Sequence, residues 1–364
     1  MVEWKKLGEV CSFNRGRTIT AKNAVEGDVP VIAGGQTPSY FHNESNRTGE
    51  TIAIAGSGAY AGFVSYWNQP IFVSDAFTVD PSEKLKHKYL FHWLKMKQKN
   101  IFDTQKGAGV PHVHGKDISG FTIPIPSLSE QQRIVETLDT FTASIDNLKE
   151  QIAQRRKQYE HYRDQLLDID GKEMDIVPFG DVCEMIKGNG VQKVDFVENG
   201  IGCIHYGQIY TYYGSYTYTT NKFVSKETFE KAKKASKGDI VMTDTSENVE
   251  DICKSVAYLG DDDIAVSNHA LIIKHKQNPR FLSYSTQTNS FLIQKRKVVV
   301  GAKVSGIKPA HLAQIKIYLP NIDEQSRIVS ILDAFEASIA NLEEQLALRQ
   351  KQYEYYREKL LTFE

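Results

Sequence analysis

The chain has 364 residues, 41% of them hydrophobic and 24% charged, which is typical of a folded globular protein with two or three domains. No apolar run reaches the roughly 18 residues that a membrane-spanning helix needs, and residues 1–6 are too polar for the core of a signal peptide. We therefore expect a cytoplasmic protein without membrane contacts.

The net charge of −1 conceals an uneven distribution of charge along the chain. Residues 1–126 and residues 171–320 each carry a surplus of three positive charges, whereas residues 127–170 and 321–364 carry surpluses of three and four negative charges. A DNA-binding protein with a separate scaffold is expected to concentrate basic charge on the parts that grip the DNA. The distribution therefore supports a nucleic-acid partner, although each surplus is small.

The first half is predicted to be a mixed α/β domain. Residues 51–55, 69–74 and 121–125 have the composition of strands, while residues 88–96 follow a helical period. Turn-rich loops such as Gly34-Gly-Gln-Thr-Pro38 and Gly56-Ser-Gly58 lie between the strands. We expect binding residues on these loops, because a rigid scaffold commonly presents functional side chains there.

A long helix is predicted from Glu130 to Leu167. Its apolar residues recur at alternating steps of four and three, which is the seam of a coiled coil. Ser129, followed by Gln132 at the capping-box spacing, is the predicted start. The ten seam positions are Ile134, Leu138, Phe141, Ile145, Leu148, Ile152, Arg155, Tyr159, Tyr162 and Leu166.

The second half follows the same plan. Strands are predicted at residues 239–243, 264–267, 270–274 and 315–319, which again indicates a mixed α/β domain. Leu7-Gly-Glu-Val-Cys11 resembles Phe179-Gly-Asp-Val-Cys183, and Gly107-Ala-Gly-Val110 resembles Gly301-Ala-Lys-Val304. The middle of each half differs, so a common scaffold carries two diverged domains.

A second long helix is predicted from Glu324 to Leu361, with Asp323 as its cap. At an offset of 194, 25 of the 38 positions from 130 to 167 are identical, so the two helices are copies. Its seam consists of Ile328, Leu332, Phe335, Ile339, Leu342, Leu346, Arg349, Tyr353, Tyr356 and Leu360.

The arginine in each seam predicts the direction of pairing. Parallel helices in register would place Arg155 opposite Arg349, which is unfavourable, so antiparallel pairing is expected. The predicted fold is α+β: two mixed α/β domains in tandem, at residues 1–126 and 171–320, each followed by a long helix within residues 127–170 and 321–364. The two helices are expected to pair as an antiparallel coiled coil with pseudo-twofold symmetry. The alternative is that each helix packs only on its own domain.

Candidate DNA-contacting residues combine cations, amides and tyrosines on the loops of both halves. Arginine and lysine suit phosphates or guanine, glutamine and asparagine suit adenine, and tyrosine can pack on the backbone or on thymine methyl groups. Any one of them could equally be a solvated loop residue, so the set is informative only as a whole. The candidates are Arg15, Arg17, Gln36, Thr37, Tyr40, Ser57, Tyr60, Lys106, His112, His114, Lys116, Lys187, Gln192, Tyr206, Gln208, Tyr212, Tyr213, Thr243, Asp244, Ser246, Asn248, Lys303, Ser305 and Lys308.

No motif for catalysis, a cofactor or a metal is apparent in the chain. Gly56-Ser-Gly-Ala-Tyr-Ala-Gly62 resembles a nucleotide loop, but residues 63–67 read as a strand where a dinucleotide site needs a helix. His112 and His114 lack a third metal ligand nearby, and residues 261–263 read as a solvated acidic turn. The four cysteines form no Cys-x-x-Cys pair, so reduced and mostly buried thiols are expected. We expect the chain to catalyse no reaction alone.

Two variable halves, each closed by a Pro-x-x-x-Glu-Gln-x-Arg-Ile-Val start to a heptad helix, resemble the specificity subunits of type I restriction-modification enzymes. The resemblance covers essentially the whole chain. It implies that each globular half recognises one part of a split DNA site and that the helices at residues 130–167 and 324–361 set the gap between the parts. Because Gly301-Ala-Lys-Val-Ser-Gly306 replaces Gly107-Ala-Gly-Val-Pro-His112, the two halves are not expected to recognise the same half-site.

The same resemblance implies double-stranded DNA, two methyltransferase subunits and two motor subunits as partners. S-adenosylmethionine, ATP and Mg²⁺ would be bound by those partners, and none is expected in this chain. A helix of about 39 residues is about 58 Å long, enough to span a site of two short blocks and a spacer within about one and a half turns of B-DNA, at about 34 Å per turn. That length is compatible with major-groove recognition by both halves.

Three alternatives remain open from the sequence. A specificity subunit or fused segment of a type IIB or IIG restriction-methylation enzyme would use the same recognition domains, although no methyltransferase motif is present. A coiled-coil scaffold for protein partners would also have paired helices, but would show no DNA sequence preference. An unrecognised hydrolase is the third.

Overall fold

The computed structural model describes residues 2–171, 175–301 and 305–363, and it divides into two compact units. The first unit contains residues 1–151 together with residues 342–364, and the second contains residues 152–341. Each unit therefore includes a section of both long helices, α5 (Leu128–Leu167) and α11 (Ile322–Leu361). The expected domain boundaries near residues 126, 170 and 320 remain a prediction, since the compact units follow packing and not the repeat.

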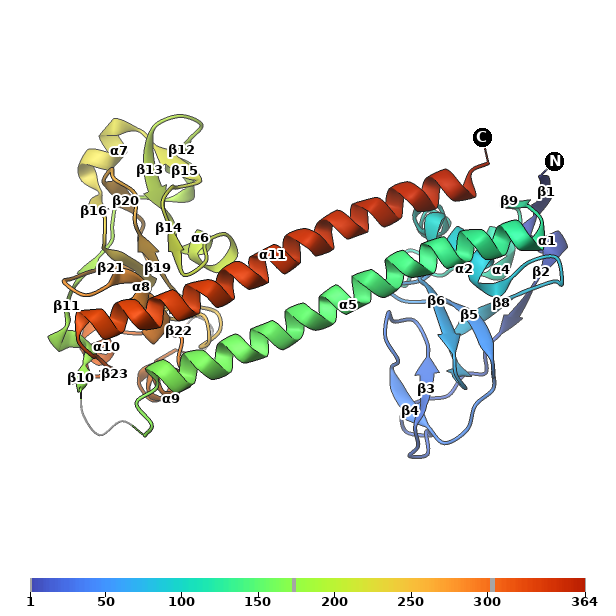
Figure 1. Ribbon diagram of the computed structural model, residues 1–364, viewed down its shortest axis with the longest axis horizontal. Coiled ribbons are helices and arrows are strands. Elements are labelled where there is room, and N and C mark those ends of the chain that lie inside the picture. Colours follow the sequence, from blue (N-terminus) through green and yellow to red (C-terminus); the bar gives the residue numbers. More distant parts are fainter. Residues whose placement is uncertain (1, 172–174, 302–304, 364) are drawn as a thin grey trace. The chain divides into compact units, whose positions relative to one another are not determined.

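An antiparallel sheet in the order β2-β8-β5-β6 lies at the centre of the first unit, and α2 packs on β5 and β6 (Figure 1). A smaller sheet has the order β4-β3-β7, and β1 pairs with β9. The elements before α5 are β1 (Glu3–Lys6), α1 (Leu7–Val10), β2 (Cys11–Arg15), β3 (Val29–Ile32), β4 (Tyr40–His42), β5 (Glu50–Ala55), β6 (Val64–Asn68), β7 (Phe72–Val73), β8 (Ala76–Pro81), α2 (His87–Met96), α3 (Gln98–Phe102), α4 (Gly115–Ile118) and β9 (Thr122–Ile125).

The second unit has two five-stranded sheets, in the orders β11-β21-β17-β19-β14 and β12-β15-β13-β20-β16, and the pairs β10-β23 and β18-β22. Its elements between the long helices are β10 (Ile176–Pro178), η1 (Phe179–Asp181), β11 (Cys183–Lys187), η2 (Lys193–Asp195), β12 (Phe196–Val197), β13 (Ile201–Ile204), α6 (Tyr206–Thr211), β14 (Tyr216–Thr217), β15 (Lys222–Val224), α7 (Lys226–Lys231), β16 (Lys233–Ala235), β17 (Ile240–Thr243), β18 (Thr245–Ser246), β19 (Ser255–Tyr258), β20 (Ile264–Val266), β21 (Ala270–His275), α8 (Pro279–Ser285), α9 (Asn289–Val298), β22 (Ser305–Gly306), α10 (Pro309–Leu312) and β23 (Lys316–Tyr318).

The α+β prediction is confirmed, and most predicted strands form within a residue or two of their expected ends. The prediction for residues 69–74 was too long, because only β7 forms there. Pro70 has no N–H to donate to a neighbouring strand, and Ile71 makes only an isolated bridge with Arg47.

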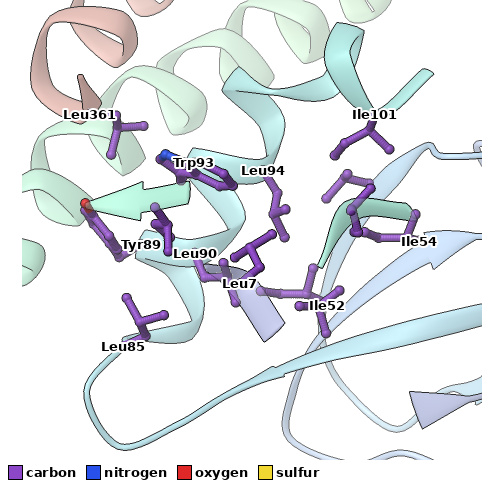
Figure 2. Packing of buried hydrophobic residues seen from close by; sticks show 14 of the residues in the cluster. Leu7, Ile52, Ile54, Leu85, Tyr89, Leu90, Trp93, Leu94, Ile101 and Leu361 are labelled. Carbon is purple, nitrogen blue, oxygen red and sulfur yellow. The ribbon is translucent and has the colours of Figure 1, made fainter. Parts of the chain in front are cut away.

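The hydrophobic core of the first unit joins residues that are far apart in the sequence. Leu7, Ile52 and Trp93 are essentially inaccessible, and Leu361 from the end of α11 packs in the same cluster (Figure 2). In the second unit the equivalent leucine, Leu167 at the end of α5, joins the core. Each compact unit is thus completed by the end of a long helix.

Both long helices begin earlier than expected, and their predicted caps were wrong. The backbone N–H of Glu130 donates to Ser127 Oγ at 3.3 Å, and the N–H of Glu324 donates to Asn321 Oδ1 at 2.9 Å. Ser129 and Asp323 instead lie inside the first turns. Ser and Asn are both favoured caps because a short side-chain oxygen reaches the free N–H two or three residues later.

The helix sections in each unit pair antiparallel, as predicted. In the first unit the rings of Phe141 and Tyr356 stack 5.3 Å apart, and the Arg349 guanidinium lies 5.7 Å from the centre of Phe141. In the second unit Phe335 makes the corresponding contacts, with Tyr162 at 5.4 Å and with Arg155 at 5.8 Å. The seam arginines therefore contact aromatic rings, a favourable cation–π arrangement.

Burial of the seam varies along its length. Ile134 and Leu138 are fully buried, whereas Tyr162 and Tyr356 are 44% and 40% exposed. At the last seam position the predicted residues are Leu166 and Leu360. The buried residues are instead their neighbours, Leu167 and Leu361. A strict heptad drifts relative to the 3.6-residue turn of a straight helix, which accounts for a shift of one position at the end.

The attachment of each helix to its globular part uses matched residues. Gln131 accepts a hydrogen bond from the N–H of Lys86 at 2.9 Å, and Gln325 accepts one from the N–H of Asn278 at 3.0 Å. Their amides donate to the carbonyls of Pro126 and Pro320, at 3.0 and 2.8 Å. Buried amides whose oxygen and nitrogen are both hydrogen-bonded in this way attach the start of each helix rigidly to its globular part.

Candidate nucleic-acid interface

Four separate segments converge in the first unit and line a cavity of about 390 Å³, namely the end of β2, the exit of β5, the start of β8 and residues 112–116. The Gly56 carbonyl accepts from the N–H of Val113 at 3.1 Å, and Ser57 forms a bridge with His112. A side chain on Gly115 would lie 2.6 Å from Phe13, so only glycine allows α4 to approach β2 this closely. Backbone contacts therefore bring the end of β2, the exit of β5 and the start of α4 together.

Basic and polar side chains predicted from the sequence line this cavity. Arg15 comes from β2, and Lys116 lies in α4. The rings of His112 and His114 are nearly parallel, with centres 6.2 Å apart. The Ser57 hydroxyl contacts Asp75, an acidic residue that the sequence analysis did not select. The first unit thus has a cleft with a basic rim and one carboxylate.

Other predicted residues of the first unit have partners in the protein. Lys106 forms a 2.5 Å ion pair with Asp117, and Arg17 lies 3.6 Å from Glu44. Although burial opposes it, hydrogen bonds from Lys106 and the His114 backbone lower the pKa of Asp117, so this pair is charged at neutral pH. Tyr40 donates its hydroxyl proton to the Ile19 carbonyl at 2.6 Å.

The remaining candidates of the first unit lie in its loops. Gln36 and Thr37 belong to the connection between β3 and β4, and Tyr60 is 46% exposed. A side chain on Gly34 would lie 2.3 Å from the Ser57 carbonyl, so this connection packs tightly against the exit of β5.

In the second unit, equivalent backbone positions join the strand ends in the same way, and we call this meeting of strand ends and helix start the junction of each unit. The N–H of Asp244 donates to the His269 carbonyl at 3.2 Å, as the N–H of Gly56 donates to the Asp75 carbonyl at 3.0 Å in the first unit. The Asp244 carbonyl accepts a hydrogen bond from the N–H of Ile307 at 2.9 Å, which matches the hydrogen bond from the N–H of Val113 to the Gly56 carbonyl. The loops of the two units are therefore directly comparable.

Different side chains occupy this second junction. Lys187 takes the place of Arg15, and its Nζ lies 3.1 Å from Asp244 Oδ2. Ser246 and Ser305 face each other across the β18–β22 pair, and Lys308 precedes α10. Lys303 lies outside the described residues.

Several predicted residues of the second unit have structural partners. Thr243 is buried and donates to the Asp251 carbonyl at 3.0 Å, Gln208 accepts from the His205 N–H at 2.8 Å, and Tyr213 is 8% exposed. The Asn248 amide donates to Asp251 at 2.7 Å, and the backbone N–H of Gln192 donates to Asp195 at 2.7 Å.

Two tyrosines of the second unit differ in their surroundings. Tyr212 is 62% exposed, whereas the ring of Tyr206 lies 5.4 Å from the ring of His269. The sequence analysis missed both His269 and Asp75. His269 stands directly before the predicted strand at residues 270–274, and Asp75 directly follows the segment predicted as a strand at residues 69–74, so both positions could have indicated a loop residue at a sheet edge.

Nothing in the described part of the chain resembles a metal centre or a reactive thiol. It contains no group of three potential metal-binding side chains. Burial raises the pKa of each of the four cysteine thiols to about 12, so they are protonated at neutral pH. No helix among the described residues is both long and apolar enough to cross a membrane.

The family model for the type I restriction modification DNA specificity domain matches residues 1–155 and 171–349, so it covers both copies of the repeat. The chain belongs to this family. The two matched ranges include both globular parts and most of both long helices.

Proteins named as specificity subunits of type I systems are similar to this chain over nearly all of their length. A Haemophilus influenzae chain, named as a predicted type I restriction enzyme specificity subunit, is 28% identical over 385 residues, which cover 100% of this chain and 96% of the relative. The EcoR124I/EcoR124II specificity subunit of Escherichia coli is 28% identical over 409 residues, covering 100% and 94%. The type I S subunit of M. genitalium shares the fold, with a TM-score of 0.64, 16% identity and coverage of 100% and 97%.

Proposed function

We propose that this chain is the specificity subunit of a type I restriction-modification complex and that it recognises an asymmetric two-part DNA target. Each unit would bind one half-site through the junction of β-strand ends and helix start described above. The observation that carries this proposal is the pair of equivalent junctions, which have the same backbone bonds but different side chains. Equivalent loops with different side chains are what two different half-sites require.

The candidate residues divide by their availability to DNA. Arg15, His112, His114 and Lys116 line the first cavity, while Lys187 is exposed at the second junction. Cations at such rims position a duplex through its phosphates and can also contact guanine edges. Buried candidates such as Thr243 and Gln208 would instead support the shape of the loops.

The two long helices would set the distance between half-sites and bind the methyltransferase subunits. Their surplus of negative charge makes them a poor surface for DNA and leaves them available to protein partners. In this proposal two methyltransferase and two motor subunits supply S-adenosylmethionine, ATP and Mg²⁺, and this chain supplies recognition without catalysis. The complex would act in the cytoplasm, where chromosomal DNA lies.

Exchange of one recognition region tests the two-part model. The chain, produced with its methyltransferase subunit, is compared with a chimera in which residues 1–126 come from another specificity subunit. Sequencing of methylated adenines is expected to show that one half of the motif changes and the other half is retained. Changes in both halves would refute modular recognition, and the absence of any motif would favour a protein scaffold.

A further inference from the structure

A buried carboxylate with an unused oxygen lies at the junction of the second unit. Asp244 is 4% exposed, and its Oδ2 is paired with Lys187. Its Oδ1 is buried and accepts no hydrogen bond from the described residues. Because an ionised oxygen without a hydrogen bond is costly to bury, this arrangement favours a donor close to Oδ1.

His269 stands beside that oxygen on an uncommon backbone conformation. Its Nδ1 lies 4.0 Å from Asp244 Oδ1, and its side chain is 53% exposed. Its φ is 63°, in the left-handed region that few residues other than glycine adopt. The bond from the Asp244 N–H to the His269 carbonyl holds this conformation. Conformations of this kind are retained where they place a functional side chain.

The cluster presents two donors to solvent around one buried acceptor. Lys187 Nζ has three N–H groups, and its side chain is 64% exposed. Because Nδ1 of the exposed His269 ring faces Asp244, its Nε2 points away from the carboxylate, where an N–H can donate to a base. Guanine offers two acceptors in the major groove, O6 and N7, whereas cytosine offers a donor and adenine offers one donor and one acceptor. Two neighbouring donors therefore match guanine.

The first unit lacks this arrangement at the equivalent place. Gly56 occupies the position of Asp244, and the carboxylate there is Asp75, which contacts the Ser57 hydroxyl. Arg15 replaces Lys187 and forms no side-chain ion pair within the described residues. The proposed guanine contact is therefore a property of the second unit alone.

We propose that Lys187 and His269 bind a guanine in the second half-site and that Asp244 is the residue that positions both. This inference rests on the proposed function, because it assumes that the second unit contacts DNA. Lys187 and His269 would together donate to one base. Asp244 would not contact that base, but would determine specificity by positioning the two donors.

Sequencing of methylated adenines in cells that produce the complete methyltransferase complex tests the proposal. The variants are Lys187→Met, which keeps the apolar stem, His269→Asn, which tolerates the left-handed backbone, and Asp244→Asn. Lys226→Met, an exposed lysine on α7, is the matched control. Each of the three variants is expected to lose discrimination at one guanine by about tenfold or more, with the first half-site unchanged.

The other outcomes separate this proposal from the proposed function. An unchanged motif in Lys187→Met and His269→Asn, with a two-part motif in the wild type, would overturn the guanine contact alone. A uniform loss across all sequences with a smaller salt dependence would also overturn it, because that result identifies a phosphate contact. A wild-type complex without any motif would overturn both. Since Lys187 and His269 are exposed, their variants keep the test valid even if Asp244→Asn fails to fold.

Discussion

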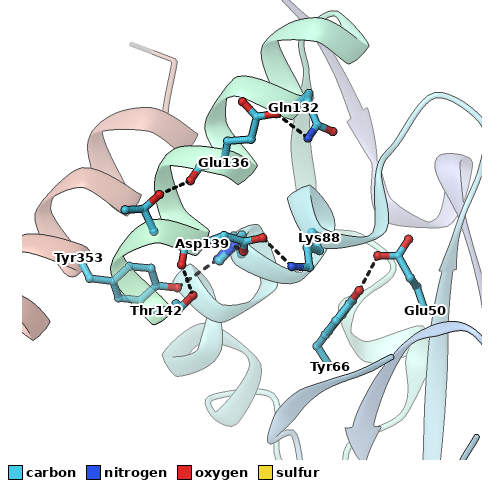
Figure 3. Close-up of polar contacts among 10 residues, drawn as sticks. Glu50, Tyr66, Lys88, Gln132, Glu136, Asp139, Thr142 and Tyr353 are labelled. Carbon is cyan, nitrogen blue, oxygen red and sulfur yellow. Dashed lines mark hydrogen bonds and ion pairs between the residues drawn. The ribbon is translucent and has the colours of Figure 1, made fainter. Parts of the chain in front are cut away.

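At the scale of single residues, one carboxylate on each long helix ties that helix to its globular part. In the first unit Asp139 lies 2.9 Å from His92 Nε2 and 2.5 Å from Lys88 Nζ, while His92 Nδ1 lies 3.1 Å from the Tyr353 hydroxyl (Figure 3). In the second unit Asp333 contacts Arg280 and accepts from the Tyr284 hydroxyl at 2.7 Å. The acid is retained, and its partners have changed in type.

Replacement of Asp139 by asparagine should destabilise the first unit in a pH-dependent way. Burial raises the pKa of Asp139, but hydrogen bonds from His92 and Lys88 outweigh it, so the pKa lies below its usual value of about 3.9. A lowered pKa means that the charged acid stabilises the fold above that value and that this contribution is lost as the pH falls through the lowered pKa. We expect a loss of about 1 to 3 kcal/mol at pH 7, measured by chemical denaturation.

The loss from Asp139→Asn should shrink towards zero as the pH falls through the lowered pKa of Asp139, because the wild-type acid becomes neutral as well. Asp146→Asn is the matched control, since the one ion pair of Asp146 among the described residues is with the exposed Lys149 at 3.2 Å, and the substitution should change stability by less than about 0.5 kcal/mol. An equal effect of Asp139→Asn at pH 7 and at low pH would contradict the electrostatic explanation.

At the scale of secondary-structure elements, the end of α11 belongs to the core of the first unit. Leu361 is fully buried there among residues of α1, α2 and β9, in the cluster that Figure 2 shows in part. The seam pattern alone would assign this part of the helix to pairing with α5. Its packing instead closes a globular core whose other buried members precede it by more than 200 residues.

Truncation of Leu361 to alanine should therefore destabilise the first unit by about 2 to 5 kcal/mol, the usual cost of a cavity at a fully buried leucine. Thermal denaturation together with hydrogen exchange of α2 measures the effect. Leu348→Ala, on the same helix but 56% exposed, should cost less than about 0.5 kcal/mol. A similar small effect of both substitutions would show that the end of α11 does not support this core.

At the scale of the whole molecule, the parts proposed to bind DNA and the parts proposed to bind protein subunits carry net charges of opposite sign. The globular parts carry the positive surplus and the long helices the negative surplus. Repulsion between acidic helices and phosphates would keep DNA on the loops, while the helices remain free to bind proteins.

DNA affinity should consequently fall steeply with salt concentration, because each neutralised phosphate contributes about −0.9 to the slope of log K against log salt. Fluorescence anisotropy with the cognate duplex measures that slope. Arg15→Ala should reduce the magnitude of this slope by about one, whereas Lys149→Ala on α5 should leave the slope unchanged. An affinity that does not depend on salt would argue against phosphate contacts by the loops.

The sequence by itself determined the repeat, the two long helices, their antiparallel pairing and most of the seven strands that it predicted, but not the many short strands also present among the described residues. Periodicity and local composition indicate the longer, strongly patterned segments because they act over a few neighbouring residues. The sequence selected Asp244 and Lys187 singly but gave no reason to link them to His269, and it passed over Asp75. Those groupings were decided by the tertiary structure, since Lys187, Asp244 and His269 stand on three different strand ends. The caps at Ser127 and Asn321 and the burial of Leu361 likewise depend on which surfaces meet after folding, and that information is not contained in local patterns.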